Sequence, residues 1–576
     1  MAQVEDGARP KASAWSAIAV FFERRMLVML ALGFAAGLPN LLIFDTLSAW
    51  LRESGVSLQA IGFFSLATLA YSLKFLWAPV VDRTSLPMLT QLVGHRRSWM
   101  LAAQGAVILG LWLISGANPA QNLGIVAAFA VLVAFSSATQ DIVIDAWRIE
   151  AAGQERQGAM AAMYQWGYRI AIIVAGVAPL MLASRINWGF AYATMATLMA
   201  IGILAVFLAP MEKKRPELAP LLPQDLPAKP VPEAIEWTLR LALVAIGAFL
   251  FGAGFTAQFD MVQWAGGFFG ATPESLTGFK AAWAAKPWGV FIQVAFAFAG
   301  LAMMVAAAWP APGRRTRPGE YFIRSYGEPI KDFFTRFAGT AGLILAMICC
   351  YRLSDFVLNI MNPFYLDLGF DKDRIAEVRK VFGVVMLMTG VAGAGWGIAR
   401  FGLMKCLIVG AFAGPVSNLV FAWLATQGPD WRAFATAIAV DNVTAGFSGT
   451  VLIAYMSSLT SSGFTATQYA LFSSLYALPG KLIAAQSGGI VEASARGAND
   501  GGAFSGLTGL FANLPAESFA KGAADLGVSP AALGAGYVVF FFYSCIVGMA
   551  ALALALIIAR KQAEDAPPAE EKKATA

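Results

Sequence analysis

Long apolar stretches follow one another along the whole chain, and short charged or Pro/Gly-rich joints separate them. A helix needs about 20 mostly apolar residues to cross about 30 Å of hydrocarbon, so each stretch predicts a membrane-spanning helix. The pattern therefore predicts an all-α polytopic membrane protein. Its 14 expected spans are residues 26–50, 58–80, 98–117, 121–148, 158–184, 188–210, 237–259, 286–309, 337–361, 374–400, 403–426, 432–458, 464–490 and 535–560.

Lys and Arg collect in alternate joints between these spans, which fixes the expected orientation. Cytoplasmic loops carry an excess of these cations, so we expect the cation-rich joints and both termini in the cytoplasm. The first residues, MAQVEDGARPKASAW, lack the basic region of a signal peptide, and no cleaved leader is expected. The cation-rich joints contain Arg83, Arg96 and Arg97; Lys213, Lys214 and Arg215; Arg314, Arg315, Arg317 and Arg324; Arg400 and Lys405; Arg560 and Lys561.

The composition is typical of a membrane protein and argues against several classes of function. Hydrophobic residues make up 58% of the chain and charged residues 13%, against about 25% charged in soluble domains. The formal charge of +6 needs no nucleic-acid partner, because the cytoplasmic loops account for it. With His95 as the single histidine and four cysteines inside apolar spans, we expect no metal site, no disulfide and no cofactor. A phosphate-binding G-x-x-x-x-G-K-[ST] loop is absent from the sequence, so neither ATP hydrolysis nor another enzymatic activity is expected.

The chain contains two weak internal echoes at nearly the same offset. LRESGVSLQAI (51–61) matches YLDLGFDKDRI (365–375) at Gly55/Gly369 and Ile61/Ile375, 314 residues apart. RQGAMAAMYQWGYR (156–169) and TQYALFSSLYALPGK (467–481) each have a glutamine at the second position, where a span opens, and one cation 12 or 13 residues later. Parallel repeats of this kind build transporters from two bundles. The expected divisions are a cytoplasmic N-terminus (1–25), a first bundle (26–210), a linker region with two extra spans (211–336), a second bundle (337–560) and a cytoplasmic tail (561–576).

Three segments outside the bundles have distinctive compositions. Residues 212–232 and 310–336 are charged and Pro-rich, which predicts cytoplasmic linkers with little fixed structure. Residues 491–533 are rich in Gly, Ala and Ser and are expected outside the cytoplasm, with a short helix near residues 514–526. The sequence assigns no role to this last segment.

The chain resembles the AmpG muropeptide permease family of the major facilitator superfamily. In the first half the resemblance rests on GFAAGLP (33–39), LSAWLRESGVSLQAIGFFSLATLAYSLKFLWAPVVDR (47–83), HRRSWMLAAQ (95–104) and SSATQDIVIDAWRIE (136–150). In the second half it rests on YRLSDFVLNIMNPFYLDLGF (351–370), VDNVTAGFSGTVLIAYMSSLT (440–460) and FTATQYALFSSLYALPGKL (464–482). It thins in the two extra spans, in residues 491–533 and at the termini.

The resemblance implies the major facilitator fold, here two six-helix bundles with two extra transmembrane helices between them. It also implies proton-coupled import, across the bacterial inner membrane, of N-acetylglucosaminyl-1,6-anhydro-N-acetylmuramic acid with or without a stem peptide. The expected partners are this anhydromuropeptide, protons and the lipid bilayer, with the chain as a monomer. Acetyl-CoA transporters are similar to this family, so transport of another anionic amphiphile is the alternative.

Ionisable residues within the spans are the candidates for proton coupling, because charge in hydrocarbon is costly and marks a pathway or a partner. Asp141 and Asp145 lie one helical turn apart, and such a pair titrates as a unit. Arg148, three residues further on, offers a second interpretation in which it neutralises Asp145 in a structural network. Asp45 in the first span and Asp441 in the twelfth are the other proton-coupling candidates.

The candidates for substrate binding combine one deep cation with aromatic groups in the fifth span. Arg169 suits the lactyl or peptide carboxylate of a muropeptide, and aromatic faces suit pyranose rings. The alternative is that Arg169 pairs with an aspartate across the bundle. Lys481 is its expected counterpart in the second half, or else a lysine that extends toward a helix end. The remaining candidates for substrate contact are Gln140, Tyr164, Trp166 and Tyr168.

The remaining charged residues are expected to gate the transporter or to stabilise it. Arg352 and Asp355 are three residues apart in the ninth span and are expected to satisfy each other. The pairs Asp82-Arg83 and Arg96-Arg97 flank the cytoplasmic joint between the second and third spans, as in facilitators generally.

Overall fold

The computed structural model describes residues 20–56, 69–153, 156–210, 225–256, 259–268, 270–272, 274–285, 288–309, 315–371, 375, 377–484 and 487–564. Helices make up its regular structure, and these residues contain no strand. Within the described residues, eleven helices or helix pairs are long and apolar enough to cross a membrane. They match 11 of the 14 predicted spans; the others, 26–50, 58–80 and 464–490, are not among them.

A first group of helices is formed by residues 20–210. Its two apolar cores join α2 to the helices of the second to sixth predicted spans, and one of the cores also includes Ala466 and Ala470 from the second half of the chain. We call this set the N-terminal group; its elements are η1 (Val20–Phe22), α2 (Arg24–Leu41), η2 (Leu42–Thr46), α3 (Leu47–Glu53), α5 (Leu69–Leu73), η4 (Lys74–Leu76), α6 (Ala78–Arg83), α7 (Leu89–Val93), α8 (His95–Ser115), α9 (Leu123–Ala151), α10 (Gln157–Arg185), α11 (Trp188–Leu198) and α12 (Ala200–Leu208).

A second group is formed by residues 341–564 around two further apolar cores. We call it the C-terminal group; its elements are α19 (Ala341–Cys350), η7 (Leu353–Asn359), α20 (Met361–Leu368), η8 (Val378–Phe382), α22 (Gly383–Phe401), α23 (Leu403–Ala425), α24 (Trp431–Ser458), α25 (Thr465–Ala484), α26 (Ser487–Asn499), η9 (Ser505–Phe511), α27 (Ala520–Leu526) and α28 (Pro530–Glu564).

The internal echo of the sequence reappears as two matching helix ends. Gly55 and Gly369 have positive φ angles of 80° and 105°, which glycine adopts without strain. In the first copy, the N–H of Gly55 donates to the carbonyl of Arg52, and the N–H of Val56 donates to the carbonyl of Leu51. In the second copy, the N–H of Gly369 donates to the carbonyl of Leu366, and the N–H of Phe370 donates to the carbonyl of Tyr365. The same chain reversal therefore occurs twice, 314 residues apart.

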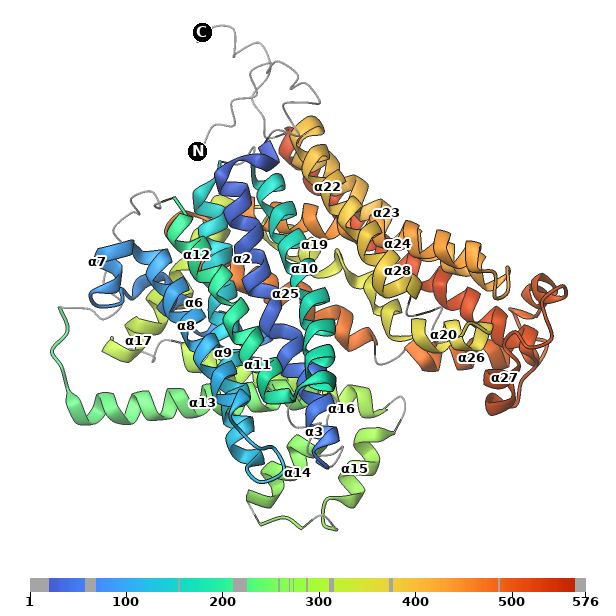
Figure 1. Ribbon diagram of the computed structural model, residues 1–576, viewed down its shortest axis with the longest axis horizontal. Helices are drawn as coiled ribbons and strands as arrows, with labels where there is room; N and C mark the ends of the chain where they lie inside the picture. The colour runs from blue at the N-terminus through green and yellow to red at the C-terminus, as the bar shows by residue number, and fades with distance from the viewer. Residues whose placement is uncertain are drawn as a thin grey trace, which may run out of the picture.

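The residues between the groups are more ordered than the sequence predicts. They form α13 (Pro230–Thr256), α14 (Phe259–Phe268), α15 (Thr277–Ala284), α16 (Trp288–Ala308), α17 (Arg317–Phe322), η6 (Ile323–Gly327) and α18 (Glu328–Arg336). In Figure 1, α13 runs across the long helices of the N-terminal group. The prediction of little fixed structure is wrong for residues 317–336, and residues 491–499 belong to α26 instead of a loop.

The two groups converge at one end of the molecule and diverge toward the other, as Figure 1 shows. The end of convergence, where α2 begins and α28 ends, is called the closed end below. Contacts between the groups join α10 to α22 and α24, and α25 to α5, η4, α6 and α9.

Candidate functional site

A buried charge cluster occupies the polar stripe of α9 that the sequence predicts. Arg148 donates from Nη2 to Asp145 Oδ1 at 3.3 Å, and Lys74 Nζ lies 3.9 Å from Asp145 Oδ2. The side chains of Lys74 and Asp145 are only 11% and 9% exposed. Since a buried charge without a partner is strongly destabilising, both cations compensate Asp145. These contacts favour the interpretation in which Asp145 belongs to a structural network.

Arg148 also connects the two groups of helices. Its Nη1 donates to Ser457 Oγ of α24 at 2.9 Å, and its guanidinium lies 5.2 Å from the ring centre of Tyr469 on α25. The side chain is fully buried. Any separation of the groups at this level must therefore expose or re-pair Arg148.

Gln140 and Asp141 lie one turn deeper on α9 and have unused hydrogen-bonding capacity. Gln140 is completely buried, and neither its amide nitrogen nor its amide oxygen has a hydrogen-bond partner. Asp141 is 8% exposed, and its Oδ1 has no partner either. Buried polar atoms in native proteins are normally hydrogen-bonded, so unpartnered atoms point to a ligand, water or proton that completes them. Lys74 and Asp145 are the charged neighbours of Asp141.

Arg169 is the deep cation of α10, and it lies close to a second cation. Its Nε is buried without a hydrogen-bond partner. Arg352, from the C-terminal group, is near enough to repel it electrostatically, and Tyr168 and Tyr476 are its other neighbours. Two guanidinium groups from opposite groups of helices favour an anion between them.

The aromatic residues of α10 have different surroundings. The rings of Tyr164 and Tyr168 are 6.0 Å apart, and Tyr168 Oη accepts a hydrogen bond from Asn40 Nδ2 at 2.6 Å. Trp166 instead donates from Nε1 to the carbonyl of Met388 on α22 at 3.0 Å. Tyr168 thus lies near Arg169 and contacts the ring of Tyr164, whereas Trp166 joins the two groups.

The C-terminal group contributes a second set of charges. Arg352 donates from Nε to Asp355 Oδ2 at 2.5 Å, which confirms that the two residues pair. Asp441 on α24 has Asp355, Arg379 and Arg352 as its charged neighbours. Asp45 lies in η2 and Lys481 in α25, but their side chains are outside the described part of the structure, so their predicted roles stay predictions.

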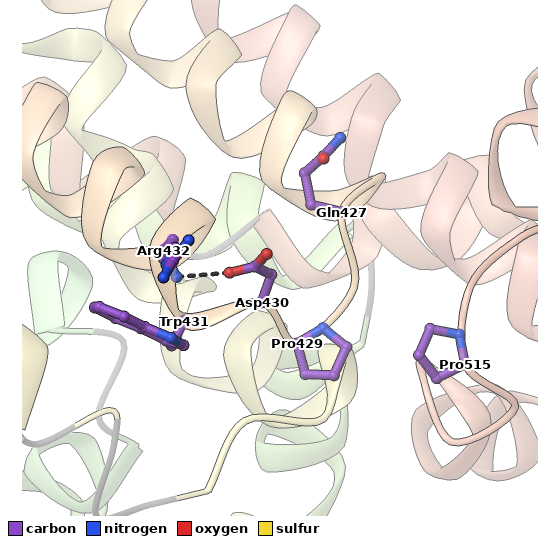
Figure 2. Close-up of a pocket in the computed structure, with 6 residues that line it drawn as sticks. All are labelled: Gln427, Pro429, Asp430, Trp431, Arg432 and Pro515. Carbon is purple, nitrogen blue, oxygen red and sulfur yellow. Dashed lines mark hydrogen bonds between the residues drawn. The ribbon is translucent and has the colours of Figure 1, made fainter.

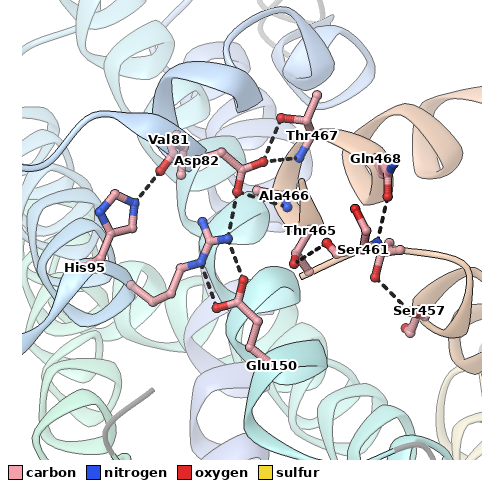
Figure 3. Close-up of polar contacts among 12 residues, drawn as sticks. Val81, Asp82, His95, Glu150, Ser457, Ser461, Thr465, Ala466, Thr467 and Gln468 are labelled. Atoms are coloured by element: carbon pink, nitrogen blue, oxygen red, sulfur yellow. Dashed lines mark hydrogen bonds and ion pairs between the residues drawn. The ribbon is translucent and has the colours of Figure 1, made fainter. Parts of the chain in front are cut away.

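A second buried network crosses between the groups at the closed end, around the Asp82 carboxylate (Figure 3). Asp82 accepts hydrogen bonds from the backbone N–H groups of Ala466 (3.2 Å) and Thr467 (2.7 Å) and from Thr467 Oγ1 (2.7 Å). These donors belong to the first turn of α25, where the helix dipole also favours a negative charge. Arg96 Nη2 lies 2.7 Å from Asp82 and 2.8 Å from Glu150, and its side chain is fully buried.

The two neighbouring arginines take different roles. Arg83 donates to Glu328 Oε2 at 2.8 Å and to the carbonyl of Arg324 at 2.6 Å. Arg97 donates to the carbonyls of Val206 and Phe207 at the end of α12, so it stabilises the N-terminal group alone. Of the four residues predicted here, Asp82 and Arg83 contact other parts of the chain across the closed end.

A shallow pocket of about 480 Å³ lies apart from these networks, at the start of α24. Figure 2 shows its lining, with Trp431 and Arg432 on one side and Pro515 on the other. Asp430 is already occupied as the cap of α24, because its Oδ1 accepts from the N–H of Arg432 at 2.7 Å. The described residues contain no group of three His, Cys, Asp or Glu side chains that could hold a metal ion.

Sequence reasoning missed three partners in these networks. Lys74 is the second cation of Asp145, and its presence in an apolar span was the available signal. Glu150 forms an ion pair with Arg96 and is the last residue of the segment SSATQDIVIDAWRIE (136–150). Thr467 opens α25 and appears in the second internal echo, but its contact with Asp82 joins residues 385 positions apart.

Comparisons with known proteins agree with this architecture. The profile described as Acetyl-coenzyme A transporter 1 matches residues 25–123, and that of the Major Facilitator Superfamily matches residues 85–291. "Putative transporter AmpG 4" of Rickettsia felis is 28% identical over 477 residues, covering 82% of this chain and 91% of the relative. "Anhydromuropeptide permease" of Escherichia coli K12 is also 28% identical over 477 residues, covering 82% of this chain and 76% of the relative.

The chain is thus similar over most of its length to AmpG-type permeases, and part of it matches the profile of the major facilitator superfamily. It is accordingly a multi-pass membrane permease and not an enzyme. Among solved structures, the proton:xylose symporter XylE aligns over 93% of this chain and 95% of its own, with 9% identity and a TM-score of 0.46. The human organic anion transporter MFSD10 (TETRAN) aligns over 93% and 100%, with 13% identity and a TM-score of 0.44.

Proposed function

We propose that this protein is an AmpG-type transporter that imports anhydromuropeptides into the cytoplasm by proton-coupled alternating access. One relative, from Escherichia coli K12, is named an anhydromuropeptide permease. The cargo would be the disaccharide of N-acetylglucosamine and 1,6-anhydro-N-acetylmuramic acid, with or without its stem peptide. In this proposal the closed end faces the cytoplasm of a bacterial inner membrane, as the cation-rich loops predict.

The observation that carries the proposal is the pair of neighbouring guanidinium groups, one from each group of helices, of which Arg352 is 33% exposed. Arg169 has an unpartnered Nε, and Arg352 lies close enough to repel it. A carboxylate between the two would relieve the repulsion and contact both groups of helices at once. Such a ligand would stabilise the conformation in which the groups are close, and alternating access requires that coupling.

Sugar recognition is supported by aromatic residues of α10 and an amide of α9. Tyr168 and Tyr164 offer aromatic faces, and Gln140 has a free amide donor and a free amide acceptor. Hydroxyl and N-acetyl groups need both kinds of partner. In this proposal Arg169 and Arg352 hold the carboxylate, and the other three residues contact the sugars.

Proton coupling is proposed for Asp141 in particular. Its Oδ1 lacks a partner, whereas both oxygens of Asp145 face cations. A carboxylate with an unused oxygen can accept a proton without first breaking an ion pair. Asp441 is the corresponding candidate in the C-terminal group.

Uptake into membrane vesicles tests the proposal directly. Radiolabelled anhydro-disaccharide is expected to accumulate under an inward proton gradient and to stop accumulating when a protonophore is added. Arg169→Gln should raise the half-saturating concentration at least tenfold, because a charge-assisted hydrogen bond is lost from a buried site. Arg185→Gln, an exposed change on the same helix, is the matched control. Accumulation without any gradient would refute the proton coupling.

A second candidate function is transport of an acyl-coenzyme A. The match of residues 25–123 to the acetyl-coenzyme A transporter profile favours it, and two guanidinium groups would also suit a phosphate. Competition separates the two candidates. If acetyl-CoA blocks uptake of its own label and the anhydro-disaccharide neither enters nor competes, the second candidate replaces the first.

A further inference from the structure

The segment Arg317–Arg336, made of α17, η6 and α18, touches both groups of helices at the closed end. It is called the strap below. The sequence predicts little fixed structure here, yet the strap is helical throughout. Its contacts with the C-terminal group differ in kind from its contacts with the N-terminal group.

The strap is anchored to the C-terminal group by an apolar side chain and by a dense polar contact. Phe333 is 3% exposed and packs at 5.2 Å, centre to centre, on Phe472 of α25. Gln468, also on α25 and 2% exposed, donates to the Pro329 carbonyl at 2.8 Å and to Asp332 Oδ2 at 2.9 Å. Arg336 donates to the Leu459 carbonyl at 2.9 Å. Buried aromatic packing together with satisfied polar groups makes this side the firm one.

The described contacts with the ends of the second predicted span, by contrast, are polar. Arg83 of α6 pairs with Glu328 Oε2 at 2.8 Å and donates to the Arg324 carbonyl at 2.6 Å. Tyr326 Oη donates to the carbonyl of Leu76 in η4. The side chain of Glu328 is 40% exposed, whereas that of Arg83 is 4% exposed, so water can replace the ion pair only once opening has exposed Arg83.

We propose that the strap is a latch of the closed end, which stays on the C-terminal group and releases the N-terminal group when that end opens. The proposal rests on the proposed function only in that alternating access must open this end. Opening costs the strap its polar contacts with Arg83 and Leu76, which water can replace, and leaves the packing of Phe333 intact. The linker between the bundles thereby acquires a role that does not depend on the identity of the cargo.

Distances between spin labels on the full chain in lipid nanodiscs test the latch. Ser85 and Ser462 are exposed and lie in the loops after α6 and before α25. Both are changed to Cys after Cys349, Cys350, Cys406 and Cys545 have been replaced by Ala. In the double variant Tyr326→Phe with Glu328→Gln, the population with long distances should rise about fivefold, as expected when one weak ion pair and one hydrogen bond are lost. Lys331→Gln, an exposed charge change on α18, is the matched control.

A third label position tests the direction of release. Thr335 is exposed on α18. In the opened population, the distance from Thr335→Cys to Ser462→Cys should stay unchanged, and the distance to Ser85→Cys should lengthen. The reverse pattern, or an unchanged Ser85 to Ser462 distribution in the double variant, would overturn the latch. Glu328→Gln alone provides the measurement if the double variant does not fold.

These distances are measured without substrate, so they separate the latch from the proposed function. Normal anhydro-disaccharide uptake with unchanged distances refutes the latch alone. A clear distance change in a protein that transports no anhydromuropeptide supports the latch and refutes the proposed cargo.

Discussion

Two helices, α10 and α25, begin at the closed end against the opposite group, yet the two contacts are chemically different. At α25 the Asp82 carboxylate accepts three hydrogen bonds from the first turn, with Arg96 and Glu150 behind it. At α10 the contact is apolar. A Cβ at Gly158 would lie 2.9 to 3.0 Å from side-chain atoms of Ile398 on α22, so only glycine allows the helices to approach this closely.

The difference matters because the two starts occupy matching places in the internal echo. Gln157 and Gln468 open the two repeats, 311 residues apart. A charged contact depends on every member of its network, because removing one leaves the others buried and unpaired. An apolar contact depends on shape and tolerates compensating changes. At the closed end, the charged contact of α25 is therefore lost when any one of its members is removed, whereas the apolar contact of α10 tolerates compensating substitutions.

The largest effect is expected from Asp82→Asn. The amide nitrogen cannot accept from the α25 N–H groups, and Arg96 loses half of its charge compensation. Breaking such a buried network costs about 3 to 5 kcal/mol, so we expect a large fall in thermal stability and loss of the short Ser85 to Ser462 distance. Spin-label distances and melting in detergent measure both.

Asp430→Asn is the control for this change, since Asp430 caps α24 within its own group and is exposed. Asparagine is also a good helix cap, so only a few tenths of a kcal/mol should be lost. Equal effects of the two substitutions would mean that the Asp82 contact is an ordinary helix cap and not a joint between the groups.

A smaller effect is expected at the apolar contact. Gly158→Ala places a methyl group against Ile398, and overpacking of this kind costs about 1 to 3 kcal/mol. Ile398→Ala in the same chain should recover most of this loss, which a double-mutant cycle in melting temperature measures. Gly153→Ala, with open space around it, is the control. Strict additivity of the two changes would contradict direct contact.

Removing the single hydrogen bond between Trp166 and Met388 should have a still smaller effect. Trp166→Phe loses the 3.0 Å bond and keeps most of the apolar area, so we expect about 1 kcal/mol and a modest lengthening at the closed end. Trp188→Phe is the matched control, because its Nε1 donates to Glu53 within one group at 2.8 Å. That variant should leave the spin-label distances unchanged.

The helices could be predicted from the sequence because apolar runs of membrane length leave the backbone few alternatives. The matching helix ends at Gly55 and Gly369 could be predicted from the offset of 314 residues between the two similar sequence segments. The strap could not be predicted in this way. Its charged, Pro-rich composition is typical of a mobile linker, and its partner Arg83 lies 245 positions from Glu328.

The site was predictable in its residue types and less so in its pairings. The spacing of Asp141, Asp145 and Arg148 placed all three on one face, and Arg148 does contact Asp145. The position of Lys74 along its own span does not predict that it lies beside Asp145. The structure places Lys74 in a short 3-10 turn beside Asp145. Such a pairing depends on how different helices pack together. The residue spacing within one helix gives no information about that packing.

The smallest effect is expected from Arg156→Gln, and its smallness is informative. Arg156 pairs with Glu23 at 2.9 Å beside the start of α10, but the two side chains are 45% and 34% exposed. An exposed pair contributes about 0.5 kcal/mol or less and weakens further with salt. If the α10 contact is held by shape, Arg156→Gln should leave the melting temperature and the Ser85 to Ser462 distances unchanged at 0.5 M salt. A shift comparable to that of Asp82→Asn would mean that both helix starts are held by charge.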